Sequence, residues 1–395
     1  MTASQQATWR SQVLLIIFAQ FTIILALDMS DPYWPLILSV SHVFSTRTLQ
    51  YWSGVIYVAP LLTTIFTTLF WAKIGERIGY KKMVLRAGFA LAVTQFSLFF
   101  FVNPWAILGI RLIQGGVAGF TAAAQAWSLA VTPTNTHSQT VGRLQSASAM
   151  GSIVGPVCGG LISHYYGYVS IFITSGCMCV LIAIILAKYL KENSRLTPFE
   201  IKNGKFFLRD PGKNFLLLLI CGAQAARWMS TPFFALYMVK QLHANNLTIG
   251  FMYATMALSM SLITSTLGQM IDKRLHRRVA VGYLLIVALF LGGLTQWGFA
   301  LISKSYIAFG LSLVWGISLG LISLILFSFL LCNIGDSSRA QAVGLGNSAA
   351  KLGNLLGIVI GTLIQAAGHF IISFAVIGSV YLVLAVLAGC YTARG

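Results

Sequence analysis

Acidic residues are scarce in this sequence. Only 8 of its 395 residues are Asp or Glu, and 9% are charged, whereas a soluble globular domain carries about 25% charged residues. Hydrophobic residues make up 57% of the chain. A soluble core of this size does not need so much apolar surface, so the composition excludes a soluble protein and predicts a membrane protein.

Residue patterns for catalysis or metal binding are also missing. The six cysteines lie in apolar segments, and the closely spaced Cys177 and Cys179 have no histidine or carboxylate nearby. We interpret the cysteines as small buried hydrophobes. There is no H-E-x-x-H or P-loop pattern. The sequence therefore predicts neither an enzyme nor a bound cofactor or metal.

Apolar segments of about 20 or more residues fill most of the chain, and each can cross about 30 Å of hydrocarbon as a helix. The first segment runs into Pro32 and Pro35 without a small-residue cleavage site, which favours a membrane span over a cleaved signal. The alternation of a transmembrane barrel is absent. The predicted fold is all-α, with twelve transmembrane helices at about 12–38, 50–71, 83–103, 105–130, 141–163, 168–189, 214–240, 248–270, 279–301, 305–331, 341–365 and 370–391.

The basic residues fall mainly on one side of these predicted helices. With the N-terminus inside, 20 of the 26 Lys and Arg residues lie on the inner side, and three (Arg47, Lys240 and Lys304) lie on the outer side. This bias predicts that both termini are cytoplasmic. It also explains the net charge of +18 as membrane topology, so no nucleic-acid partner is expected.

The two halves of the chain are related in sequence. The segment from Gln139 matches the segment from Gln341 without a gap, at ten identical positions 202 residues apart. Near the start of each half, Ala26, Ser30, Pro32 and Leu36 match Ala226, Ser230, Pro232 and Leu236. An even number of spans separates the copies, so both halves enter the membrane in the same direction. We predict two pseudo-symmetric six-helix bundles (1–189 and 214–395), joined by a cytoplasmic linker (190–213), with a central site between the bundles.

Two segments carry recognisable patterns. The loop after the second span contains an acid–base pair, a glycine and a further basic residue (Glu76, Arg77, Gly79 and Lys81), and Asp272 with Lys273 repeats the pair in the second half. We interpret this loop as an ion-pair latch that serves gating; plain anchoring by basic residues is the alternative. The fifth span is rich in glycine (Gly142, Gly151, Gly155, Pro156, Gly159 and Gly160), which is typical of close helix crossings with a bend.

Together these patterns resemble the major facilitator superfamily over essentially the whole chain. The loop departs from the family pattern by Ala72 in place of Gly and Glu76 in place of Asp. The glycine pattern of the fifth span is similar to the antiporter motif of drug exporters in that family. The resemblance implies alternating access, a cavity lined by the first, fourth, seventh and tenth spans, and export rather than import.

The two acidic residues in the first span, Asp28 and Asp31, are candidates for proton coupling, since ionisable groups inside hydrocarbon are costly. Arg111 opens a segment, Arg111-x-x-Gln114, that is similar to the family's proton-coupling motif. At 1.5 Å per residue, Arg111 and Asp28 lie at similar depths, about 9 and about 10 Å from the outer face. We predict that a proton on Asp28 cancels its attraction to Arg111. The alternatives are a fixed salt bridge for Asp28, a helix-end carboxylate for Asp31 and a structural arginine that bonds backbone carbonyls for Arg111.

Further residues are predicted to line the substrate cavity, although aromatic residues of this kind also occur in cores and at membrane interfaces. They are Arg227, Lys351, Trp34, Trp228, Gln114 and Phe233. Lys351 lies about 15 Å deep. Three buried cations against two acids give the cavity a positive bias, so we hypothesise an anionic substrate, such as a carboxylate-bearing amphiphile or siderophore.

The sequence as a whole predicts a proton-coupled exporter of a small organic molecule in the cytoplasmic membrane of a bacterium. It is expected to work as a monomer, driven by the proton gradient without a cofactor. One alternative is a siderophore or organic-anion carrier that exports or imports. Another is a membrane sensor of the same fold that does not transport.

Overall fold

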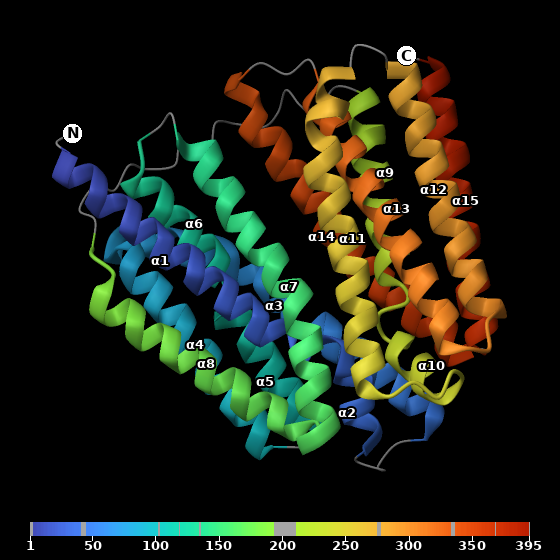
Figure 1. Ribbon diagram of the computed structural model, residues 1–395, viewed down its shortest axis with the longest axis horizontal. Coiled ribbons are helices and arrows are strands. Elements are labelled where there is room, and N and C mark those ends of the chain that lie inside the picture. The colour runs from blue at the N-terminus through green and yellow to red at the C-terminus, as the bar shows by residue number, and fades with distance from the viewer. Residues whose placement is uncertain are drawn as a thin grey trace. The chain divides into compact units, whose positions relative to one another are not determined.

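The computed structural model is helical throughout the part of the chain that it describes, and that part contains no β-strand (Figure 1). The described residues are 3–40, 45–101, 103–117, 119–133, 136–192, 211–274, 278–332, 336–367 and 369–394. The prediction of an all-α membrane protein is confirmed. The predicted linker 190–213 lies mostly outside the described residues.

The chain divides into two compact units. Unit 1 comprises Met1–Val43, Val55–Glu200 and Ile249–Ala254, and unit 2 comprises Phe44–Gly54, Ile201–Thr248 and Thr255–Gly395. The elements of the N-terminal half are α1 (Ala3–Asp28), η1 (Asp31–Tyr33), α2 (Trp34–Val40), α3 (Thr46–Ile78), α4 (Tyr80–Phe100), α5 (Pro104–Val117), α6 (Phe120–Val131), α7 (His137–Tyr166) and α8 (Val169–Tyr189). The C-terminal half contains α9 (Pro211–Trp228), α10 (Phe234–Lys240), α11 (Asn246–Arg274), α12 (Arg278–Leu301), α13 (Ser305–Leu331), α14 (Asp336–Ala367) and α15 (Phe370–Arg394).

Eleven helical segments of the described chain are long and apolar enough to cross a membrane, and each coincides with a predicted span. The twelfth predicted span, 214–240, is also helical, but it is divided into α9 and α10. Helix α9 is less apolar because it carries Lys213, Asn214, Gln224 and Arg227 among its 18 residues. These polar residues explain why the mean hydropathy of this span is lower than that of the other eleven.

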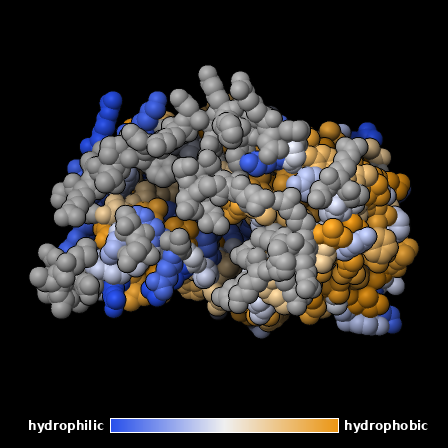
Figure 2. Space-filling model, turned by 90° about the horizontal axis from the view of Figure 1, so that it is seen from above, coloured by the Kyte–Doolittle hydropathy of each residue, from blue (hydrophilic) through white to orange (hydrophobic). Residues whose placement is uncertain are grey.

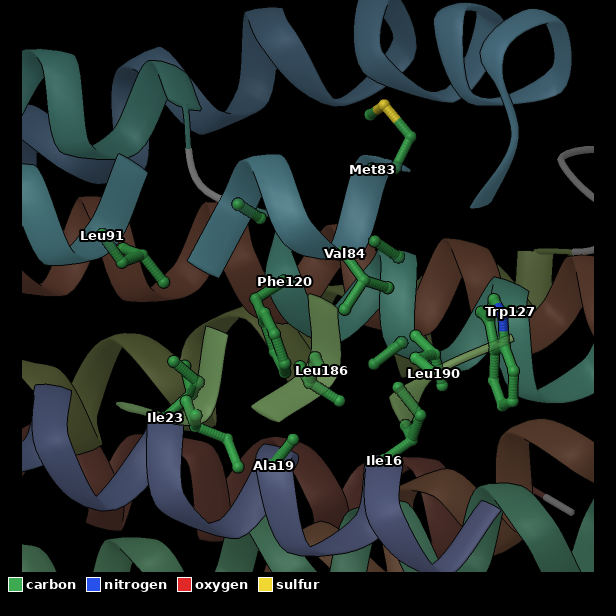
Figure 3. Packing of buried hydrophobic residues seen from close by; sticks show 14 of the residues in the cluster. Ile16, Ala19, Ile23, Met83, Val84, Leu91, Phe120, Trp127, Leu186 and Leu190 are labelled. Atoms are coloured by element: carbon green, nitrogen blue, oxygen red, sulfur yellow. The ribbon is translucent and has the colours of Figure 1, made fainter. Parts of the chain in front are cut away.

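The core of unit 1 is built from the inward faces of α1, α4, α6 and α8. Ile16 and Ile23 of α1 pack in one buried cluster with Val84 of α4, Phe120 of α6 and Leu186 of α8 (Figure 3). Each of these side chains is at most 4% exposed. Because they recur every three or four residues along their helices, one face of each helix is buried in this cluster.

Aromatic rings dominate the core of unit 2. Phe234 meets Phe299 edge to face with ring centroids 5.3 Å apart, and Tyr237 meets Phe374 at 4.7 Å. The Tyr237 hydroxyl donates a hydrogen bond to the Phe299 carbonyl. Rings at these distances and angles add to the stabilisation that comes from burying their area. The cluster fixes α10 against α12 and α15.

The two matched segments near the start of each half have the same backbone geometry. In the first half, the amide of Met29 donates to the Leu25 carbonyl at 3.1 Å, and the amide of Tyr33 donates to Ser30 at 3.0 Å. In the second half, the equivalent bonds run from Met229 to Ala225 at 3.0 Å and from Phe233 to Ser230 at 3.1 Å. Each segment is therefore a helix that breaks and restarts, which places unpaired backbone groups and polar side chains within a predicted membrane span.

Apolar side chains also cover an outer face of unit 2. Along α12, Val279, Tyr283, Val287, Phe290 and Leu294 are each at least 42% exposed and follow one another at intervals of three or four residues. This flank, formed by α12 and α15, is on the right in Figure 1, and the right-hand side of Figure 2 is largely coloured as hydrophobic. An exposed apolar stripe of this kind suits contact with lipid chains.

Candidate functional site

The first span is interrupted at its two acidic residues. Helix α1 ends at Asp28, and Asp31 begins the short 3-10 helix η1. Pro32 follows directly and has no amide hydrogen, so it cannot continue the α-helical bonding pattern. Ser30 is buried at this break, and its amide bonds to the Leu27 carbonyl at 3.3 Å. The break turns the two carboxylates toward different neighbours.

Asp28 lies against the glycine-rich helix α7. Its side chain is hydrogen bonded to Ser152 of that helix, and it is also coupled electrostatically to Asp31. A Cβ atom placed on Gly155 would be 3.0 Å from the Asp28 Cβ. The glycine at 155 therefore lets α7 approach α1 closely enough for Ser152 to reach the carboxylate.

Asp31 rather than Asp28 is the carboxylate that interacts with Arg111. Asp31 and Arg111 attract each other, and the hydroxyl of Tyr57 donates to the backbone carbonyl of Asp31. Tyr253, which belongs to unit 1, is also coupled electrostatically to Asp31. Asp31 thus interacts with one guanidinium and two phenols. A proton on its carboxylate would remove the negative charge that attracts the guanidinium.

Arg111 is held by several contacts in addition to this attraction. Its Nη1 donates to the Gln114 side-chain oxygen at 2.8 Å, and its Nε donates to the Ile56 carbonyl at 3.3 Å. The guanidinium carbon lies 4.6 Å from the centre of the Trp34 ring, close enough for a cation–π interaction. The structure thus brings four predicted site residues together in unit 1: Asp31, Arg111, Gln114 and Trp34. Their functional roles stay predictions.

The glycines of the predicted antiporter motif make the crossing between α7 and α1. A Cβ on Gly159 would lie 2.0 Å from the Met29 carbonyl oxygen, and one on Gly151 would lie 2.9 Å from the Phe21 carbonyl oxygen. Gly142 has open space around it. Gly160 is buried and accepts a hydrogen bond from Ser163.

Pro156 links the same motif to the helix break. Its carbonyl accepts a hydrogen bond of 3.1 Å from the Tyr33 hydroxyl. Gly250 of α11, which belongs to unit 1, packs against the same carbonyl: a Cβ on it would be 2.4 Å from the Pro156 oxygen. Tyr33 lies in η1, so the motif and the acidic segment form one packed assembly.

The loop between α3 and α4 is described only in part. Gly79 has a φ of 99°, a conformation that favours glycine. Glu192 accepts a hydrogen bond of 3.4 Å from the Lys81 amide, and Lys81 Nζ donates to the Ala187 carbonyl at 3.2 Å. Arg77 is exposed. The side chains of Glu76, Asp272 and Lys273 lie outside the described residues, so the predicted latch between these charges stays a prediction.

In unit 2 the predicted site residues are spread over different surroundings. Arg227 lies in the last turn of α9 and lines a cavity with Gln224. Its guanidinium carbon is 5.9 Å from the centre of the Trp228 ring. Lys351 of α14 is exposed. Phe233 is fully buried and packs on Phe374 at 5.3 Å, so it is a core residue of unit 2 in this structure.

Several polar residues near the site were not identified from the sequence. Besides Ser152 and Tyr57, Gln20 of α1 is fully buried and donates to Thr121 at 2.8 Å and to Ser148 at 2.9 Å. A glutamine inside a long apolar segment is itself a signal, because a buried amide requires partners. Within the described residues, no group of three His, Cys, Asp or Glu side chains could hold a metal ion.

A chain of many membrane-spanning helices, with charged residues such as Asp31 and Arg111 within them, is typical of a membrane transport protein. Comparison with known proteins identifies its family. The profile of the Major Facilitator Superfamily matches residues 16–220 and 216–394. The chain belongs to this superfamily.

Individual relatives agree with this assignment. The chain is 24% identical to multidrug resistance protein MdtG of Salmonella arizonae, over 90% of this chain and 89% of that protein. It is 30% identical to the staphyloferrin B transporter of Staphylococcus aureus, over 57% of this chain and 53% of that protein. A solved bacterial homolog of the human lysosomal transporter Spinster has the same fold, with a TM-score of 0.77, 14% identity and coverage of 98% of this chain and 96% of that one.

Proposed function

We propose that this chain exports a small organic molecule across the cytoplasmic membrane of a bacterium in exchange for protons, by alternating access. Both termini lie in the cytoplasm, the chain works as a monomer, and the proton gradient drives transport without a cofactor. The similarity to MdtG supports export of drug-like or amphiphilic compounds. The observation that carries the proposal is the packed assembly of Asp28, Asp31 and Arg111 with the glycine-rich helix α7.

The proposed coupling step uses the two carboxylates in sequence. When Asp31 is ionised, it pairs with Arg111; when Asp31 binds a proton, this attraction is lost and Arg111 is free to rearrange. Asp28 lies on the other side of the break and contacts Ser152 of α7. A proton on Asp28 changes the contact between α1 and α7, which is the step we link to movement of these helices.

Transport in proteoliposomes with an imposed pH gradient tests this proposal. Wild-type protein is expected to drive uphill movement of at least one member of a panel of cations, zwitterions and carboxylates. Asp28→Asn and Asp31→Asn should each lose this movement. Glu200→Gln removes an acidic residue in the polar segment between the halves and is the matched control. Undiminished proton-driven flux in both Asp variants contradicts the coupling assignment.

A second candidate function is a carrier for a siderophore or another organic anion. The similarity to the staphyloferrin B transporter favours it, together with the cation Arg227 in a cavity of unit 2. The same substrate panel separates the two candidates. Preference for carboxylates over cations supports the anion carrier, and preference for cationic dyes supports the multidrug exporter.

A further inference from the structure

One outer face of unit 1 is apolar along most of its length and ends in lysines. It is formed by α4 and α8, which lie side by side in Figure 1. A Cβ on Gly88 of α4 would be 3.3 Å from the Cβ of Ala183 on α8, and a Cβ on Gly176 of α8 would be 3.0 Å from the Phe96 ring of α4. Residue numbers rise along one helix where they fall along the other, so the two helices are antiparallel. Their glycines allow close packing and fix the register of the pair.

Both helices expose apolar side chains on the face that is turned away from the core of unit 1. Val84 of α4 and Leu186 of α8 point into the same buried cluster (Figure 3). On the opposite side of the two helices, the following apolar side chains are each at least 39% exposed: Phe89, Val93 and Phe100 on α4, and Ile173, Leu181 and Ile184 on α8. Because α4 and α8 are neighbours with a common core, these side chains form one apolar surface, which we call the α4–α8 face.

A lysine continues each exposed row at the same end of the bundle. Lys82 lies seven residues before Phe89, and Lys188 lies four residues after Ile184, so each lysine shares a helical face with its row. Both lysines are exposed. The ring of Tyr189 is also exposed, and Lys188 Nζ lies 5.3 Å from its centre. The α4–α8 face therefore ends in two cations and an aromatic ring.

The two lysines lie at nearly the same level. Lys82 is six residues before Gly88, or about 9 Å along α4, and Lys188 is five residues after Ala183, or about 8 Å along α8. Gly88 and Ala183 are in contact, so the lysines differ in level by only about 1 Å. Packed helices are about 8–10 Å apart. Two lysine side chains at one level on such helices can reach the same phosphate group.

The acidic side chains described in unit 1 do not neutralise these lysines. Glu192 accepts a hydrogen bond of 3.4 Å from the Lys81 amide, and a Cβ on Gly79 would be 2.8 Å from its Oε1. This carboxylate therefore lies over the backbone at the start of α4, where the helix dipole favours an anion. The other acids of unit 1 whose side chains are described, Asp28 and Asp31, lie at the far end of α1.

The internal repeat shows that the lysine on α8 is not required by the architecture. Helix α8 matches α15 at a separation of 202 residues, where Phe172, Gly176, Ala183 and Tyr189 recur as Phe374, Gly378, Ala385 and Tyr391. The counterpart of Lys188 is Cys390. A bias of basic residues that is set by membrane topology acts on both halves. The pair of lysines is therefore a feature particular to unit 1.

We propose that the α4–α8 face binds an anionic phospholipid, with its phosphate between Lys82 and Lys188 and its acyl chains along the two apolar rows. Lysines near a membrane surface attract anionic headgroups, and a tyrosine suits the level of the headgroups. The two rows supply one apolar track for each chain of a diacyl lipid. The inference rests on the membrane location of the chain and not on the proposed transport function.

Titration of the full-length protein with lipid, followed by native mass spectrometry, tests the proposal. The protein is purified in an uncharged detergent and its bound lipid is removed. Phosphatidylglycerol is expected to bind at least tenfold more tightly than phosphatidylcholine with the same acyl chains. Glycerophosphoglycerol, which is the headgroup without chains, should not displace it. Equal affinity for the two lipids overturns the proposal, and displacement by the headgroup alone at the affinity of the lipid overturns the assignment to a lipid.

Variants locate the binding. Lys82→Gln and Lys188→Gln should each weaken phosphatidylglycerol binding about fivefold, which corresponds to about 1 kcal/mol per cation, and the double variant about 25-fold. The matched control, Lys73→Gln with Arg143→Gln, removes two exposed cations from α3 and α7 and should bind the lipid as wild type does. Unchanged binding in the double variant, or an equal loss in the control, overturns the proposal. All four side chains are exposed, so folding does not depend on them, and the comparison of the two lipids needs no variant.

Discussion

Substitution of Gly159 by alanine tests the close crossing of α7 and α1. The new Cβ would lie 2.0 Å from the Met29 carbonyl oxygen and 2.8 Å from its carbonyl carbon, distances at which something must shift. Both atoms belong to the backbone of α1, so a side-chain rotation cannot relieve the overlap. Alanine also gains about 1 kcal/mol of helix propensity over glycine.

Gly142→Ala is the matched control on the same helix, because nothing lies within 4 Å of its Cβ position. The gain in helix propensity is common to both variants and cancels in their difference. What remains is the cost of overpacking, about 1–3 kcal/mol. We expect the upper end of this range for Gly159→Ala, since the overlap is with backbone.

The assay is equilibrium unfolding in mixed detergent micelles, followed by circular dichroism, for both variants and wild type. The internal repeat supplies a second, independent pair: Gly361, where a Cβ would be 1.9 Å from the Met229 carbonyl oxygen, and Gly344, which has open space. In each half the first variant should be less stable than the second. If Gly159→Ala is as stable as Gly142→Ala, the crossing does not depend on the absence of a side chain, and the reasoning is refuted.

Three further predictions concern unit 1. Gly79→Ala should lower the free energy of unfolding by about 1 kcal/mol or more relative to wild type, because its φ is 99°. Unchanged stability contradicts the claim. Arg111→Lys should reduce proton-driven transport at least tenfold although the charge is kept, because lysine cannot reproduce the hydrogen bonds to Gln114 and Ile56. The control, Arg143→Lys, should transport normally. Full activity of Arg111→Lys would show that a positive charge alone suffices at this position. Tyr33→Phe should cost about 1 kcal/mol because it removes the hydrogen bond that the Tyr33 hydroxyl donates to the Pro156 carbonyl. Tyr165→Phe, which is 69% exposed, should be neutral, and a neutral Tyr33→Phe removes this bond from the account.

The repeat in the sequence predicted equivalent packing in the two halves well. Matched glycines such as Gly159 and Gly361 both meet a backbone carbonyl, at Met29 and Met229. The match succeeds because a position with no room for a Cβ atom requires glycine in both copies. Apolar length likewise predicted the spans, except that the polar residues of α9 reduce the hydropathy of the seventh.

The neighbours of the two carboxylates could not be predicted in the same way. Depth along a straight helix places Asp28 level with Arg111, but α1 ends at Asp28 and a 3-10 helix begins at Asp31. The break changes the direction in which each side chain leaves the backbone, so Asp31 faces Arg111 and Asp28 faces Ser152. The two carboxylates are only three residues apart, a separation of about 4.5 Å in a helix, which depth arguments cannot resolve.

The central claim is that Asp28 and Asp31 couple substrate movement to protons and are not needed for the exchange of substrate itself. The direct measurement compares substrate counterflow without a pH gradient with gradient-driven accumulation in the same proteoliposomes, for wild type, Asp28→Asn and Asp31→Asn. Both variants are predicted to keep counterflow and to lose accumulation. Accumulation in both variants at the wild-type level would contradict the account.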